Sequence, residues 1–243
     1  MADRGSTTAT GPRTRLLDAA LIGLPDAVTS AWCLWVWLHP LAFDASAVRC
    51  VVLMMLMEFL LLNATGFFTA IPFMVELPRS VRATMIVGLA VIYFALVWAF
   101  ASPFHAFWPY LAFGWLAAGK LAWIVRNRRV TGSEHTWLTG TWAVSVVAYL
   151  GAVGIGELHS LPTFGIVPSI LPSLHLPGGE GWVSQPGNAG WLAAPHKAVA
   201  AAVFYFGAVG IFKWLYVMIR KNQPGRSRRG AQAASDASLD AAG

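Results

Sequence analysis

The sequence has little charge and almost no cysteine for its length. Only 12% of its 243 residues are charged, against roughly 25% in a soluble domain, whereas 57% are hydrophobic. A water-soluble domain of this size would leave large apolar patches on its surface. The two cysteines, Cys33 and Cys50, are too few to define a disulfide framework. The composition therefore excludes a small disulfide-stabilised domain and favours an integral membrane protein.

The sequence also lacks the short motifs of common catalytic classes. It contains no Gly-x-Ser-x-Gly, no His-Glu-x-x-His and no phosphate-binding P-loop. Their absence lowers the expectation of an enzyme without excluding one, and we predict no cofactor. The basic residues behind the net charge of +6 are scattered rather than clustered on one module, so nucleic-acid binding is not indicated either.

Six apolar stretches are each long enough to cross a bilayer as a helix. A helix rises ~1.5 Å per residue, so ~20 residues cross ~30 Å of hydrocarbon, and lipid offers no partner to the open backbone of other structures. The expected spans are 21–41, 47–71, 81–101, 104–125, 139–156 and 197–219. The predicted fold is an all-α bundle of six transmembrane helices (16–221), with a disordered leader (1–15) and a disordered basic tail (222–243).

The basic residues also predict the orientation of the bundle. Thirteen lie in the tails and the connections on one side, two (Arg49 and Lys197) lie on the other, and Lys120 and Lys213 lie inside spans. The positive-inside rule places the basic side, and therefore both termini, in the cytoplasm of an inner (plasma) membrane protein. Basic residues near the C-terminus are also candidates for contact with anionic lipid headgroups: Arg220, Lys221, Arg226, Arg228 and Arg229.

Cleavage of the first span is a competing interpretation. The stretch Ala45-Ser46-Ala47 after it loosely resembles a signal-peptide cleavage site. Against this, the segment is long, and its apolar part contains Pro25 and Asp26. Cleavage would leave five spans with the new N-terminus outside.

Ionisable residues inside the predicted spans are the main candidates for function. Glu58 lies near the centre of the second span, where a charge is costly and marks either an ion path or a hydrogen bond that fixes helix packing. Asp26, Thr29 and Ser30 share one face of the first helix with Cys33. We expect Asp26 to pair with Lys120 or Lys213, unless these lysines extend to the nearby interface instead.

The histidines suggest a weaker, second kind of site. Most fall on the predicted outer side, and imidazoles beside a carboxylate can bind zinc or copper. Their spacing matches no known ligand signature, and interfacial histidines usually only form hydrogen bonds. The candidate ligands are His39, His105, Glu157, His159 and His196.

The long outer connection and the glycine pattern complete the prediction. Six prolines between 157 and 196 exclude regular helix over most of that connection, yet it is too apolar for a solvated linker. We expect it to fold back over the outer end of the bundle or to rest in the headgroup region. Glycines should mark close helix contacts: Gly151, Gly154, Gly156, Gly207 and Gly210. Tyr149 and Tyr205 each precede the same string, GAVGI, which we interpret as coincidence.

Three functions fit these features. The leading hypothesis is a small transporter-like or permease-like protein, or its helper subunit, with Glu58 and Asp26 in a polar interior. An alternative is a structural or assembly subunit of a membrane complex, with membrane-protein partners. A third is a membrane enzyme or metal-binding protein that uses the outer histidines.

Overall fold

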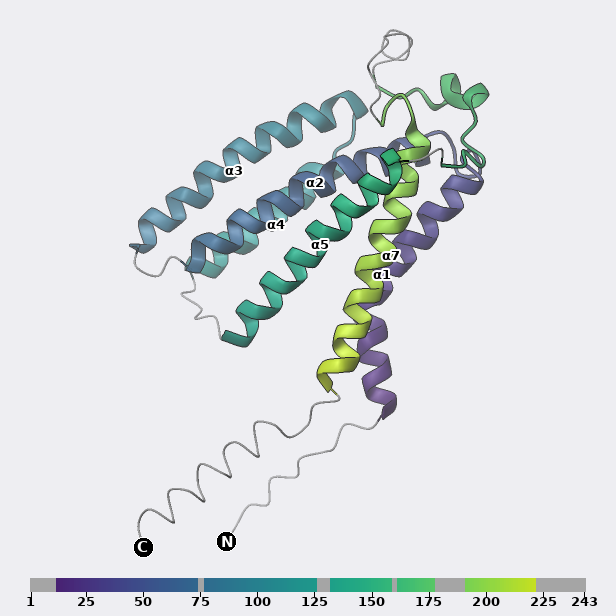
Figure 1. The fold of residues 1–243 in the computed structure, drawn as a ribbon. Helices are drawn as coiled ribbons and strands as arrows, with labels where there is room; N and C mark the ends of the chain where they lie inside the picture. Colours follow the sequence, from purple (N-terminus) through teal and green to yellow (C-terminus); the bar gives the residue numbers. More distant parts are fainter. Residues whose placement is uncertain (1–11, 74–76, 126–131, 159–160, 178–190, 222–243) are drawn as a thin grey trace, which may run out of the picture.

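The computed structural model describes residues 12–73, 77–125, 132–158, 161–177 and 191–221 (Figure 1). This part of the chain is helical and contains no strand. Its long helices are α1 (Pro12–Leu38), α2 (Ser46–Phe73), α3 (Arg79–Ala101), α4 (Trp108–Val125), α5 (Gly132–Leu158) and α7 (Pro195–Lys221). Two short 3-10 helices, η1 (Ser102–Phe104) and η2 (Pro168–Leu174), lie in the connections.

Five of these helices are long and apolar enough to cross a membrane: α1, α2, α3, α5 and α7. Their outward surfaces are apolar as well, since Val91 is 65% exposed and Val147 is 70% exposed. The predicted sixth span, α4, forms as an 18-residue helix but is not among the five. Three tryptophans and Lys120 lower its mean hydropathy. The described chain is thus an all-helical protein with several helices suited to a bilayer.

Helix α2 forms the centre of the bundle and contacts each of the other long helices. One of its faces, which includes Val52 and Met55, packs into a core with α1, α5 and α7. Its other face, which includes Met57 and Leu60, packs into a second core with α3 and α4. The helices α1 and α7 lie side by side and diverge from α3 and α4 (Figure 1).

Glycine brings α1 and α7 into close contact. A Cβ atom on Gly23 of α1 would lie 2.9 Å from the Gly210 carbonyl oxygen, and one on Gly210 would lie 3.3 Å from the Ala27 nitrogen. The prediction of close packing is confirmed for Gly207 and Gly210. It is wrong for Gly151 and Gly154 of α5, where an added Cβ would meet nothing within 4 Å. The glycines of the same string, GAVGI, therefore make close contacts in α7 and meet open space in α5.

The long connection after α5 packs onto the end of the bundle, as one of the two predicted arrangements required. Its described part, 161–177, contains η2 and no α-helix. Ile166 and Leu174 are almost fully buried in the core shared with α1, α2 and α7. The Gly165 N–H donates to the Trp37 carbonyl at 3.1 Å, and a Cβ on Gly165 would lie 2.5 Å from the Leu38 carbonyl oxygen.

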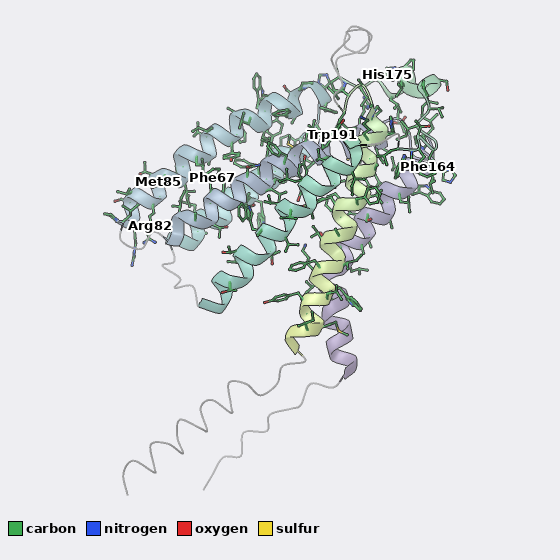
Figure 2. All side chains as sticks on the ribbon, in the orientation of Figure 1. Phe67, Arg82, Met85, Phe164, His175 and Trp191 are labelled. Atoms are coloured by element: carbon green, nitrogen blue, oxygen red, sulfur yellow. The ribbon has the colours of Figure 1, made fainter. Side chains whose placement is uncertain are left out.

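This connection lies at the end of the bundle opposite to the start of α1 and the end of α7. Figure 2 shows Phe164, His175 and Trp191 gathered at one end, with Arg82 at the far end of α3. The start of α1 and the end of α7 also point away from the connection (Figure 1). The predicted outer loop and the predicted basic side therefore lie at opposite ends of the helices.

Candidate functional site

A hydrogen bond between two helices places Glu58 inside the bundle. The Tyr205 hydroxyl of α7 donates to Glu58 Oε1 of α2 at 2.5 Å. Glu58 is partly buried, and Met57, directly before it, and Leu60, two positions after it, are buried. The carboxyl that sequence placed near the middle of the second span therefore has a specific partner on another helix.

An ion pair joins α7 to α1 at a second depth. Lys213 Nζ lies 2.7 Å from Asp26 Oδ2, and the two side chains are 26% and 14% exposed. This confirms Lys213 as a partner of Asp26. The side chain of Lys120, the other predicted partner, lies outside the described residues. Asp26 and Lys213 are also close enough to Glu58 to act on its charge.

Helix α5 adds polar groups around the same tyrosine. Ser145 is buried and lies near the Tyr205 hydroxyl. The Tyr149 hydroxyl donates to the Met55 carbonyl at 3.0 Å, and the rings of Tyr149 and Tyr205 meet edge to face with centroids 5.7 Å apart. We refer to Asp26, Glu58, Ser145, Tyr205 and Lys213 as the polar centre.

Helix α7 carries a regular series of polar contacts. Lys197 Nζ lies 2.9 Å from Glu157 Oε2 of α5, Tyr205 binds Glu58 of α2, and Lys213 binds Asp26 of α1. These α7 residues follow one another at intervals of eight, which in an α-helix is a rise of about 12 Å and a rotation of about 80° beyond two full turns. Each side chain consequently meets an acid on a different neighbouring helix. The series spans about 24 Å of a hydrocarbon layer that is ~30 Å thick.

The predicted polar face of α1 is only partly directed toward α7. Ser30 Oγ donates to the Val203 carbonyl of α7 at 2.8 Å, and Cys33 is fully buried. Thr29 Oγ1 instead donates to the Pro25 carbonyl of its own helix at 2.8 Å. Thr29 therefore lies beside the polar centre without joining it.

Sequence reasoning missed Tyr149, Ser145 and Tyr205. A buried tyrosine needs a partner for its hydroxyl, so a tyrosine inside an apolar span is a signal for a polar contact between helices. The position of Tyr149 and Tyr205, each two residues before a glycine-containing string, was visible in the sequence. The sequence did not show which helices the two tyrosines would contact.

The predicted metal ligands do not converge in the described part of the chain. No group of three His, Cys, Asp or Glu side chains there could hold a metal ion. Glu157 is paired with Lys197, and His39 and His105 are exposed where α1 and η1 end. His159 lies outside the described residues. The metal site therefore stays a prediction that the described geometry does not favour.

Two hollows on the surface lie away from the polar centre. An apolar groove of about 350 Å³ runs between α3 and α4, lined by residues such as Ala90, Phe113 and Ala117. A second hollow, of about 400 Å³, lies where α1 ends, beside His39, Pro40 and Gly165. Neither is lined by a residue of the polar centre.

Comparisons with protein-family models, with curated proteins and with solved structures found no match.

Proposed function

We propose that this chain is a small transporter-like protein of the inner (plasma) membrane, with six spans and both termini in the cytoplasm. The apolar outer surfaces of five helices support membrane insertion. The helix α4, at 18 residues, is about 27 Å long, and it packs against α2 and α3 as a sixth span would. The basic residues of the tails and of the connections after α2 and α4 support the orientation.

The observation that carries the transport proposal is the polar centre. Two acids from different helices, Asp26 and Glu58, both bind side chains of α7 inside a bundle whose outer surface is apolar. Ionisable groups in such positions are costly, and in membrane proteins they mark substrate and ion paths. The proposed role of the polar centre is to bind the transported species within the membrane.

The experiment asks whether water reaches the polar centre during function. In a variant with Cys33→Ala and Cys50→Ala, Ser145→Cys places a thiol beside Tyr205. A transporter should let a charged, membrane-impermeant thiosulfonate react with this thiol from at least one side of the membrane. Val147→Cys is the matched control: it lies two residues further on the same helix and is 70% exposed on the outward surface, so only a lipid-soluble maleimide should reach it.

The structural-subunit alternative has an observation in its favour. The polar groups of Glu58, Asp26 and Tyr149 all have partners within the chain, as polar contacts that only fix helix packing would. In that case the charged reagent should not reach Ser145→Cys from either side of the membrane. The transport proposal would then be wrong.

A further inference from the structure

Within the polar centre, Asp26 is paired with Lys213, whereas the Glu58 carboxyl is bound to a hydroxyl group, that of Tyr205. We propose that the transported species is the proton, which Glu58 takes up and releases with the help of Tyr205 and Ser145. This inference rests on the proposed transport function and names its substrate class.

The hydrogen-bonding groups around Glu58 accommodate both of its protonation states. In the structure Tyr205 donates to Glu58 Oε1, so the carboxylate is the acceptor. When a hydronium ion delivers a proton, a new O–H bond forms on Glu58, and that group can donate to the Tyr205 oxygen. The Tyr205 hydroxyl can then rotate its own hydrogen away from Glu58, toward the side where Ser145 lies near it. The Glu58–Tyr205 hydrogen bond can thus persist, with its direction reversed, in both protonation states of Glu58.

The same geometry is unsuited to a metal ion. Sodium-sized and larger cations need several oxygen ligands, and calcium takes six to eight. Glu58 is approached by the hydroxyl of Tyr205 and, at longer range, by Asp26, Lys213 and Tyr149, which are the titratable groups of α1, α5 and α7 that act on it. Lys213 is a cation itself and is already bound to Asp26, and no cluster of metal-binding side chains exists among the described residues.

Packing along α7 indicates the side from which the proton arrives. Between Lys197 and Tyr205, five consecutive residues, 198–202, are completely buried, which closes the half of the bundle under the long connection. Between Tyr205 and Lys213 the helix is less completely buried, and the polar pair of Asp26 and Lys213 lies on this side, with Lys213 26% exposed. In this conformation Glu58 therefore exchanges its proton toward the Asp26–Lys213 end, where α1 begins and α7 ends.

The test is proton flux into liposomes that contain the purified full-length chain and the dye pyranine. With an inward-directed potential set by potassium and valinomycin, the wild-type protein should acidify the lumen, and Glu58→Gln should reduce the flux to that of protein-free liposomes. Tyr205→Phe should slow it, and Glu58→Asp should retain part of it. The matched control is Glu157→Gln, an acid that also binds a side chain of α7 but lies outside the polar centre; it should keep the wild-type flux.

A second measurement keeps the inference testable if Glu58→Gln does not fold. A lipid-soluble carbodiimide reacts with protonated carboxyl groups, so in the wild-type protein it should modify Glu58 increasingly as the pH falls, as read by peptide mass spectrometry. Modification that does not depend on pH, or a wild-type flux no greater than that of empty liposomes, would overturn the proton assignment. If Ser145→Cys is still reached by the charged reagent, transport of another species stands and the proton assignment alone is wrong.

Discussion

Lys213 Nζ lies 2.7 Å from Asp26 Oδ2, although 187 positions separate the two residues in the sequence. The contact joins the first and last helices of the chain, whose backbones approach closely at Gly23 and Gly210. The close approach matters because it lets a short aspartate side chain reach a lysine on the neighbouring helix. The ion pair and the glycine contact are therefore parts of one α1–α7 interface.

Breaking the ion pair should be asymmetric. Lys213→Met leaves the short Asp26 carboxylate without a partner and should lower the free energy of unfolding by about 3 kcal/mol. Asp26→Asn should cost less, because the long lysine can extend toward the interface. The measurement is unfolding in mixed detergent micelles. The exchange Asp26→Lys with Lys213→Asp should restore most of the loss, and failure to do so would argue against a direct pair.

The exposed pair Glu157–Lys197 is the control for that experiment. Glu157 is 44% exposed at its side chain and Lys197 is 23% exposed. Exposed ion pairs contribute roughly 0–1 kcal/mol, so Glu157→Gln should leave the unfolding transition almost unchanged. If Glu157→Gln lowered the free energy of unfolding as much as Lys213→Met does, burial would not explain a difference in strength between the two ion pairs.

Removing the Tyr205 hydroxyl should be more costly than removing both partners of its hydrogen bond. Tyr205→Phe leaves a Glu58 oxygen without its donor and should destabilise the protein by about 1–3 kcal/mol. The double variant Tyr205→Phe with Glu58→Leu removes both polar groups and should recover part of this loss. A double-mutant cycle on the same unfolding transition measures the coupling. Strictly additive losses would contradict the hydrogen bond.

Two glycine substitutions should have opposite effects. Gly23→Ala brings a methyl group to 2.9 Å from the Gly210 carbonyl oxygen, and such overpacking should cost about 1–3 kcal/mol. Gly151→Ala meets open space and should be neutral or stabilise the helix by about 0.5–1 kcal/mol. Thermal unfolding in detergent compares the two. Equal losses would mean that the α1–α7 contact is not close.

The proposed orientation predicts which of two introduced cysteines a membrane-impermeant reagent can label. The two substitutions, Ser169→Cys and Ser80→Cys, are each made in the variant that lacks Cys33 and Cys50. Ser169 lies in the long connection and Ser80 at the start of α3, and both residues are exposed. In intact cells an impermeant maleimide should label the first and should label the second only after permeabilisation. The reverse pattern would overturn the placement of the termini in the cytoplasm.

Much of the site followed from the sequence because charge in a membrane is so costly. The cost alone singled out Asp26, Glu58, Lys120 and Lys213 among the residues of the spans. The structure gives Asp26, Glu58 and Lys213 a partner on another helix, and the Lys120 side chain lies outside the described residues. The choice of Lys213 for Asp26 needed the packing of α7 against α1. Tyr205 and Ser145 had no comparable signal, because the free-energy cost of a neutral hydroxyl group in a membrane is small enough for such groups to occur in many spans.

The sequence by itself determined that this chain is helical and suited to lipid, because length and hydropathy along one segment are local properties. Tertiary structure decided which helices meet. It made α2 the central helix. It brought the glycines of GAVGI into close contact in α7 but not in α5. It also placed one acid from each of α1, α2 and α5 beside a polar side chain of α7. These outcomes depend on how apolar surfaces fit together, and almost every face of these helices is apolar. The hydrophobic pattern therefore shows that each helix is suited to lipid, but it does not show which other helices it packs against. Those contacts are fixed by the shapes of the helix surfaces and by a few polar contacts.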